Sequence, residues 1–147
     1  LHLLMTEGMD AGSVQKLLYG NAGLKGMSGI SQDVRDLEAS DDPRAAQALT
    51  YFAWRVRREV GALAAALGGI DALVFTAGIG ENARSLRARI CEGLGFLGIA
   101  IDPARNAANE REISPPGART RVLVRSTDEE AMIAHHALVL LRRSKNA

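Results

Sequence analysis

The stretch IDALVFTAGIGENAR, residues 70–84, determines how the rest of the chain can be arranged. Residues 71–76 are a short apolar run rich in β-formers, which predicts a buried parallel strand. Small residues follow at 77–80, and a helical pattern begins after them. Such a turn directs free backbone N–H groups and the positive end of a helix dipole to one point, where phosphates bind. A tight turn in which glycine only relieves crowding fits equally well, and the local pattern does not decide between the two interpretations.

Composition indicates a single α/β domain. The 147 residues are 47% apolar but only 4% aromatic, which predicts a core of small aliphatic side chains and favours helices packed on a sheet. A formal net charge of +1 provides no field that would attract nucleic acid or a membrane. We expect no signal peptide and no transmembrane span. The single cysteine, Cys91, cannot form an internal disulfide, which favours a reducing cytoplasm.

The other predicted elements are placed around residues 70–84. The clearest is a long helix that begins after cap candidates at 40–43 and ends at Gly68-Gly69. Glycines at every third position over 20–29 predict a glycine-rich loop. The chain begins without Met inside an amphipathic pattern, so we expect a fragment of a longer protein. The remaining predictions are helices at about 10–19, 83–93 (with Arg84, Arg87 and Arg89 outward) and 127–143, and strands at 95–101 and 121–126.

A dinucleotide-binding interpretation competes for the glycine turn. Gly78-x-Gly80-x-x-Ala83 meets the relaxed Rossmann fingerprint, and Asp102 follows at about the spacing of a ribose-binding acid. However, Glu81 occupies an inner position of the motif, where a pyrophosphate should lie, and like charges oppose binding there. We therefore rank a Rossmann dehydrogenase fragment second.

Three segments together resemble the C-terminal part of the acetate kinase (acetokinase) family. They are DALVFTAGIGEN, SGISQDVRD upstream and VRSTDEEAMIA downstream, in the order and spacing of the family over essentially the whole chain. The resemblance implies an incomplete ribonuclease H-like ATPase domain of the superfamily that contains actin, sugar kinases and heat-shock ATPases. It also implies reversible phosphoryl transfer between ATP and acetate, which gives acetyl phosphate and ADP and uses Mg²⁺.

The resemblance assigns two segments to the nucleotide. In the first, Asp33 accepts a hydrogen bond from a ribose hydroxyl and Arg35 lies against the base, although a local turn-capping ion pair explains both residues without the family. In the second, backbone approaches the nucleotide and Ile79 flanks adenine. The family usually has a further glycine at Ala77, so a methyl group there is expected to crowd the ligand. The nucleotide-binding residues implied are Asp33, Val34, Arg35, Gly78, Ile79, Gly80, Glu81 and Asn82.

The segment STDEE carries the metal prediction. Thr127 and Glu130 fit a capping box, which leaves Glu129 free at a helix start. By resemblance Glu129 is the carboxylate linked to the magnesium through water, and one carboxylate is reasonable because Mg²⁺ usually keeps several waters. A solvated acid that favours the helix dipole is the alternative. The family's catalytic residues have no counterpart here, so no catalytic residue is assigned.

Residues 1–147 are therefore expected to be the C-terminal nucleotide-site fragment of an acetate kinase, without its N-terminal acyl-binding domain. We expect the fragment to be inactive alone, cytoplasmic, and homodimeric through this half, as the family is. The partners implied are adenine nucleotide and acetate, with no nucleic acid and no membrane. Three alternatives stay open: a propionate or butyrate kinase, a Rossmann NAD-binding dehydrogenase fragment, and a non-catalytic nucleotide-binding or dimerisation module. An uncovered sheet edge is expected to need a partner chain or the missing part of the protein.

Overall fold

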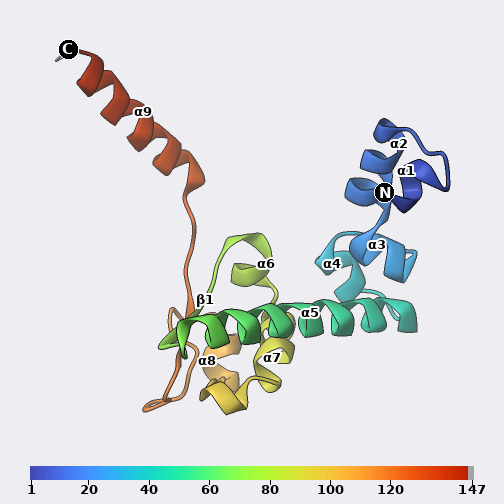
Figure 1. Cartoon of the computed structure of the whole chain (residues 1–147). Helices are drawn as coiled ribbons and strands as arrows, with labels where there is room; N and C mark the ends of the chain where they lie inside the picture. Colours follow the sequence, from blue (N-terminus) through green and yellow to red (C-terminus); the bar gives the residue numbers. More distant parts are fainter. Residues whose placement is uncertain (146–147) are drawn as a thin grey trace.

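One long helix, α5 (Pro43–Leu67), runs through the middle of the computed structural model, which describes residues 1–145 (Figure 1). The Asp42 side chain accepts the Arg44 backbone N–H at 2.8 Å, and Pro43 occupies the first turn. Gly68, with φ of 74°, ends the helix in the left-handed conformation. The start and stop signals of the sequence are confirmed, because an aspartate cap, a proline and a terminal glycine all favour the same helix limits.

A two-stranded parallel sheet lies beside one end of α5. β1 (Ala72–Phe75) pairs with β2 (Arg121–Val124), with Ala72 opposite Arg121. Both strands were predicted, and the parallel pairing predicted for β1 is confirmed. The burial predicted for β1 is wrong, because Ala72 and Val74 are exposed and only Phe75 is buried. On its other edge β2 meets residues 111–113, where the Ile113 N–H donates to the Val122 carbonyl at 2.8 Å. Because β1 and β2 run parallel, their carboxyl ends lie at the same end of the sheet.

The strand predicted at 95–101 is wrong. Residues Gly95–Leu97 form a short 3₁₀ helix, η2, that ends at Gly98 with φ of 78°. Only Ile99 makes a β-bridge, to Thr120. The Thr120 hydroxyl also donates to the Leu97 carbonyl at 2.6 Å, which fixes the turn rather than an extended strand. Two glycines around a short apolar pair thus favour a helical turn here.

The glycine-rich loop predicted at 20–29 is also wrong, because most of it is helical. Gly23 and Gly29 have positive φ and flank a helix turn, so they bound a helix instead of preventing one. The helix predicted at 10–19 is confirmed as α2 and the first residues of η1. The helices of this N-terminal part are α1 (His2–Met5), α2 (Ala11–Lys16), the π-helical η1 (Leu17–Asn21), α3 (Gly23–Ser28) and α4 (Val34–Glu38).

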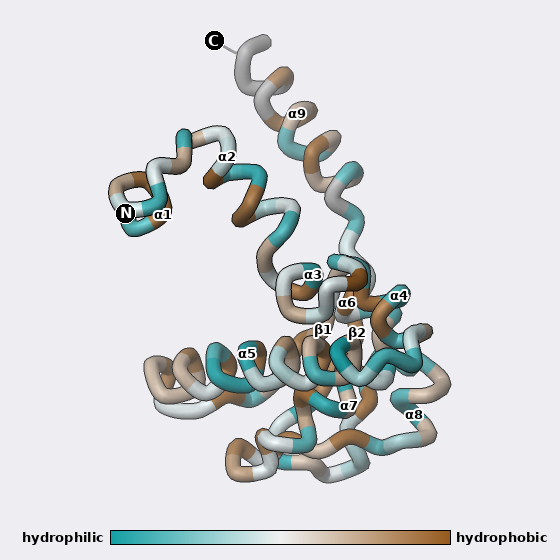
Figure 2. The backbone as a smooth tube through the Cα atoms, turned by 90° about the vertical axis from the view of Figure 1, so that its right-hand side faces the viewer, coloured by the Kyte–Doolittle hydropathy of each residue, from teal (hydrophilic) through white to brown (hydrophobic). Residues whose placement is uncertain are grey.

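The remaining helices follow the sheet strands. The helix predicted at 83–93 is confirmed as α7. The glycine turn predicted at 77–80 is wrong, because these residues belong to the helix α6. The helix α8 was not predicted; Asp102 caps it by accepting the Ala104 N–H at 2.9 Å. These helices are α6 (Ala77–Asn82), α7 (Arg84–Glu92), α8 (Pro103–Ala107) and α9 (Glu129–Lys145). The last of them projects away from the rest of the chain (Figure 1), and apolar and polar residues alternate along it (Figure 2).

The cap of α9 differs from the predicted capping box. Asp128 Oδ1 accepts the Ala131 N–H at 2.8 Å, and the helix begins at Glu129. Asp128 is therefore the cap, and the pairing of Thr127 with Glu130 is wrong. Aspartate is at least as good a cap as threonine, so the helix starts one residue later than the box requires.

The core lies where α5 meets α4, α7 and the sheet. Its side chains are small and aliphatic, as the composition predicts. Within residues 1–145, no helix is long and apolar enough to cross a membrane. The fully or nearly buried apolar residues include Val34, Leu37, Ala45, Ala48, Leu49, Ala53, Leu86, Ile90, Leu94, Ile113 and Val122.

Cys91 is part of this core, and burial raises the pKa of its thiol to about 12. We expect the native chain at pH 8 to react with a disulfide reagent such as DTNB at a small fraction of the rate of a free thiol, because the thiolate is the nucleophile. Unfolding in guanidinium chloride should restore the full rate. Fast labelling of the native chain would show that the thiol is accessible and ionised.

Candidate functional site

A cleft of about 930 Å³ lies between α4 and the corner where α6 joins α7. β1 ends at Phe75 and α6 begins two residues later, so the sheet places α6 at one wall. The opposite wall is the N-terminal part of α4. The lining residues are Gln32, Asp33, Val34, Arg35, Glu38, Gly78, Ile79, Asn82 and Ala83.

The structure brings the two predicted segments together at this cleft. Gly80 and Glu81 are the two predicted residues that do not line it. Gly80 instead faces the end of β1, and the Glu81 side chain points to the start of α9. The predicted residues that line the cleft are Asp33, Val34, Arg35, Gly78, Ile79 and Asn82.

Asp33 and Arg35 form a capping ion pair at the cleft wall. Asp33 Oδ1 accepts the Arg35 backbone N–H at 2.9 Å and so caps α4. The Arg35 Nη2 also donates to Asp33 Oδ2 at 2.6 Å. These hydrogen bonds to Arg35 lower the pKa of Asp33 to about 2, so its carboxylate is ionised throughout the neutral range. The turn-capping ion pair expected from the sequence is therefore present. Both residues also line the cleft, where a ligand can reach them.

The same arrangement occurs at the start of α5, away from the cleft. Asp42 caps that helix, and Arg44 Nη2 donates to Asp42 Oδ2 at 2.7 Å. The pKa of Asp42 is also lowered to about 2, chiefly by its hydrogen bonds to Arg44. Two aspartate–arginine caps with one geometry, only one of them at the cleft, give a matched pair for experiments.

Hydrogen bonds connect and stiffen the two walls. The Ser85 hydroxyl, at the start of α7, donates to Glu38 at the end of α4. Within α6, the Asn82 Nδ2 donates to the Gly78 carbonyl at 2.9 Å. Ile79 is 42% exposed, so an apolar side chain is open to the cleft. The cleft thus combines two carboxylates, Asp33 and Glu38, with one guanidinium and one exposed apolar side chain.

Ala77 adopts a left-handed backbone conformation, with φ of 59°. This conformation costs a residue with a Cβ roughly 1–2 kcal/mol, and glycine avoids the cost. Ala77 does not line the cleft that contains Asp33. It lines a second depression, which shares Gly78 and Asn82 with that cleft. Backbone strain is therefore a sufficient physical reason for glycine to be favoured at this position.

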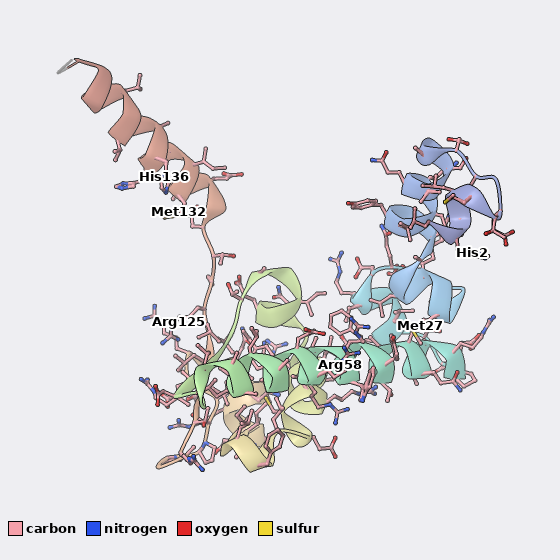
Figure 3. All side chains as sticks on the ribbon, viewed as in Figure 1. His2, Met27, Arg58, Arg125, Met132 and His136 are labelled. Carbon is pink, nitrogen blue, oxygen red and sulfur yellow. The ribbon has the colours of Figure 1, made fainter. Side chains whose placement is uncertain are left out.

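The second depression, about 490 Å³, lies between α6 and the start of α9. Glu81 Oε1 accepts the Thr127 N–H at 3.2 Å and joins the two elements. Arg125 lies where the chain leaves the sheet for α9 (Figure 3). The side chain of Glu129, the predicted metal-linked residue, lies outside the described residues. The depression is lined by Ala77, Gly78, Glu81, Asn82, Thr127, Asp128 and Glu130.

Three acidic residues, Glu81, Asp128 and Glu130, line this depression and make it a candidate for a metal ion. No cluster of three or more His, Cys, Asp or Glu that could hold a metal occurs among the described residues. The carboxylates present therefore do not form an all-protein cage. They fit Mg²⁺ of the kind that keeps water and takes its other ligands from phosphates.

Sequence reasoning missed one buried residue behind the site. Arg87 was predicted to face outward from α7 but is only 1% exposed. Its position follows Ala83 by four residues and precedes Cys91 by four, and both of these are buried. The spacing of the apolar stripe was the signal that places Arg87 on the inner face.

Comparison with known proteins identifies the family. The profile of the Acetokinase family matches residues 1–135. The chain belongs to the acetokinase family. Relatives in that family include the acetate kinase of Rhizobium meliloti, 55% identical over 141 residues, and that of Methylocella silvestris, 52% identical over 141 residues. Each alignment covers 96% of this chain but only about 35% of the relative, so the chain spans about a third of the length of these acetokinases.

Solved structures agree with this assignment. A crystal structure of Porphyromonas gingivalis acetate kinase matches 95% of this chain and 36% of its own, at 39% identity and a TM-score of 0.84. A propionate kinase from Francisella tularensis matches 90% of this chain and 35% of its own, at 33% identity and a TM-score of 0.80. The fold is thus part of the ATPase fold that acetokinases share with actin, sugar kinases and heat-shock ATPases. The Rossmann interpretation is wrong, and Asp102 caps α8 instead of binding a ribose.

Proposed function

We propose that this chain supplies the nucleotide side of an acetate kinase. The observation that carries the proposal is the cleft in which residues 33–35 and residues 78–82 meet, although they are far apart in the sequence. Membership of the acetokinase family supports adenine nucleotide as the ligand. The reaction proposed for the complete enzyme is reversible phosphoryl transfer between ATP and a short carboxylate. Acetate is favoured over propionate because most of the similar relatives are acetate kinases.

Each cleft residue has a role that its chemistry supports. Asp33 accepts a hydrogen bond from a ribose hydroxyl, since its carboxylate is ionised and reaches the cleft. Arg35 is exposed and planar, so it can lie against an adenine ring. Ile79 provides an apolar contact for the other face of the base, and the backbone at Gly78 lets the nucleotide approach closely. These residues bind and orient the nucleotide, which is most of what phosphoryl transfer requires.

Magnesium belongs to the second depression in this proposal. When bound, the ion neutralises charge on the transferring phosphates. Glu129 is the proposed metal-linked carboxylate, acting through water. Its neighbours in the sequence, Asp128 and Glu130, line the depression and add negative charge. The carboxylates of this segment would hold a magnesium ion through its water shell, as is usual for Mg²⁺ bound together with phosphates.

We further propose the setting in which the site works. The chain, residues 1–147, represents the C-terminal nucleotide-site part of the enzyme, and the acyl-binding domain supplies the acetate pocket and the catalytic residues. The chain alone is accordingly expected to bind nucleotide without transferring phosphate. A homodimer formed through this part and a cytoplasmic location, supported by the single cysteine, complete the proposal.

The Asp33 and Asp42 caps test the ligand role directly. Asp33→Asn is expected to weaken ADP binding to this chain at least about tenfold, because a hydrogen bond to a charged group contributes roughly 1.5–3 kcal/mol. Asp42→Asn should leave the affinity unchanged. Asparagine remains a good cap, so both variants should have similar Tm values. Isothermal titration with ADP and Mg²⁺ provides the measurement.

The pH dependence gives a further check on Asp33. Since the pKa of this carboxyl is about 2, it stays ionised from pH 5 to pH 8, and the effect of Asp33→Asn should be constant over that range. Equal losses of affinity in the Asp33 and Asp42 variants would point to a general effect on folding. Tighter binding of NAD than of ADP by the unaltered chain would contradict the kinase assignment.

A further inference from the structure

Arg87 is a buried arginine whose donors are all used. Its Nε donates to Asn106 Oδ1 at 2.9 Å. Its Nη1 donates to the carbonyls of Gly80 at 2.7 Å and Glu81 at 2.9 Å. Its Nη2 donates to Asn109 Oδ1 at 2.8 Å and to the Asn106 carbonyl at 3.3 Å. These acceptors come from α6, α8 and the turn after α8.

The partners of this guanidinium are neutral. No ion pair of Arg87 with a carboxylate occurs among the described residues, and burial, followed by the nearby Arg84, lowers the pKa of Arg87. Burying a charge is costly unless its hydrogen bonds are satisfied. Here the guanidinium donates hydrogen bonds to backbone carbonyl and side-chain amide oxygens, and these bonds offset the cost. The arrangement therefore depends on arginine itself, because a lysine has three donors and no planar fork.

Two of the acceptors belong to the last turn of α6. The final carbonyls of a helix cannot all be satisfied within it, and a positive charge there favours the helix dipole. A six-residue helix is also too short to be stable by itself. Since the positive φ of Ala77 adds strain at its start, α6 depends on contacts with its surroundings. Arg87 provides such a contact without lining the cleft.

We propose that Arg87 is a positioning residue that holds α6, and with it Gly78, Ile79 and Asn82, in the place required for nucleotide binding. The inference rests on the proposed function for the identity of the ligand. Its physical basis is independent, because the hydrogen bonds join α6 to residues 106 and 109 whether or not a nucleotide is bound. Arg87 itself does not line the cleft.

Arg87→Met tests this role against a purely structural one. Methionine keeps an unbranched, apolar stem and removes the charge and all donors, so Gly80 and Glu81 lose their anchor. We expect ADP affinity to fall at least tenfold and hydrogen exchange of residues 77–82 to accelerate. The control is Ile90→Ala, a buried change on the same helix that touches the core instead of α6. At a comparable fall in Tm, it should change ADP affinity less than twofold.

Arg87→Lys is the second variant and retains the charge. Lysine can reach the two α6 carbonyls but not the asparagines as well, so we expect partial recovery of ADP affinity. Equal ADP losses in Arg87→Met and Ile90→Ala, or unchanged exchange at 77–82 in Arg87→Met, would overturn the inference. Absence of ADP binding by the unaltered chain would instead overturn the proposed function. The exchange measurement would then still decide whether Arg87 anchors α6.

Discussion

Gly78→Val is expected to weaken the binding of ADP on the order of tenfold while the Tm stays nearly unchanged. Apart from its chain neighbours and the backbone of α6, a Cβ at Gly78 would meet no atom within 4 Å, so the rest of the fold leaves room for a side chain there. Gly78 lines the cleft, so the added methyl groups would occupy space that the nucleotide needs. Overpacking of a close contact typically costs about 1–3 kcal/mol. That range corresponds to roughly 5- to 160-fold in affinity, and tenfold lies toward its lower end. Calorimetric titration with ADP measures it.

Gly80→Val is the control for this prediction, because its added side chain would meet the protein instead of the cleft. A Cβ at Gly80 would lie 3.0 Å from the Phe75 carbonyl carbon, at the end of β1, and Gly80 does not line the cleft. We expect this variant to lower the Tm. It should weaken the binding of ADP only because α6 is displaced. A Gly78→Val variant that binds ADP as tightly as the parent chain would show that the nucleotide lies elsewhere.

Glu129→Gln is expected to lower kcat about 10–100-fold in an active enzyme, the usual range for changes in the surroundings of a metal ion. Activity requires a complete enzyme, so the test uses a chimera. This chain replaces the segment that it matches in the acetate kinase of Rhizobium meliloti, to which it is 55% identical. Glutamine keeps the shape of the side chain and removes one charge. Raised Mg²⁺ should recover part of the loss, and the Tm should hardly change.

Glu130→Gln in the same chimera separates the two neighbouring acids. Glu130 lines the depression beside α6, and its predicted capping role is excluded by Asp128. If Glu129 alone is linked to the metal, Glu130→Gln should reduce kcat only slightly. A larger loss with Glu130→Gln would transfer the metal role to that residue. Equal, small losses in both would indicate that the acids only favour the helix dipole.

Elements with redundant local signals could be predicted from the sequence. α5 has an aspartate cap, a proline and a terminal glycine that agree, and β1 and β2 are apolar runs rich in β-formers. Residues 95–101 lack that redundancy, because a short apolar run between glycines fits a strand and a 3₁₀ turn equally well. The error at 20–29 has a similar cause, since glycines can bound a helix as well as interrupt one.

The candidate site could be predicted only in part. The sequence indicated both segments of the cleft, and Asp33 and Arg35 could be predicted as a local pair because they are two residues apart. The role of Arg87 could not be predicted in this way. Its acceptors lie at residues 80–81, 106 and 109, and only the folded chain brings them to one guanidinium. Local sequence shows which side chains carry charge but not which distant oxygens will surround them.

The parallel pairing of β1 with β2 has a consequence for the order of folding. The two strands are separated by α6, α7 and α8, so their contacts are non-local and require the closure of a long loop before they contribute free energy. Helices form on a much faster timescale than such pairings. α5 and α7 should therefore collapse first, with the sheet added late. Since α6 follows directly from β1, the nucleotide cleft should acquire its final shape only in the last step of folding.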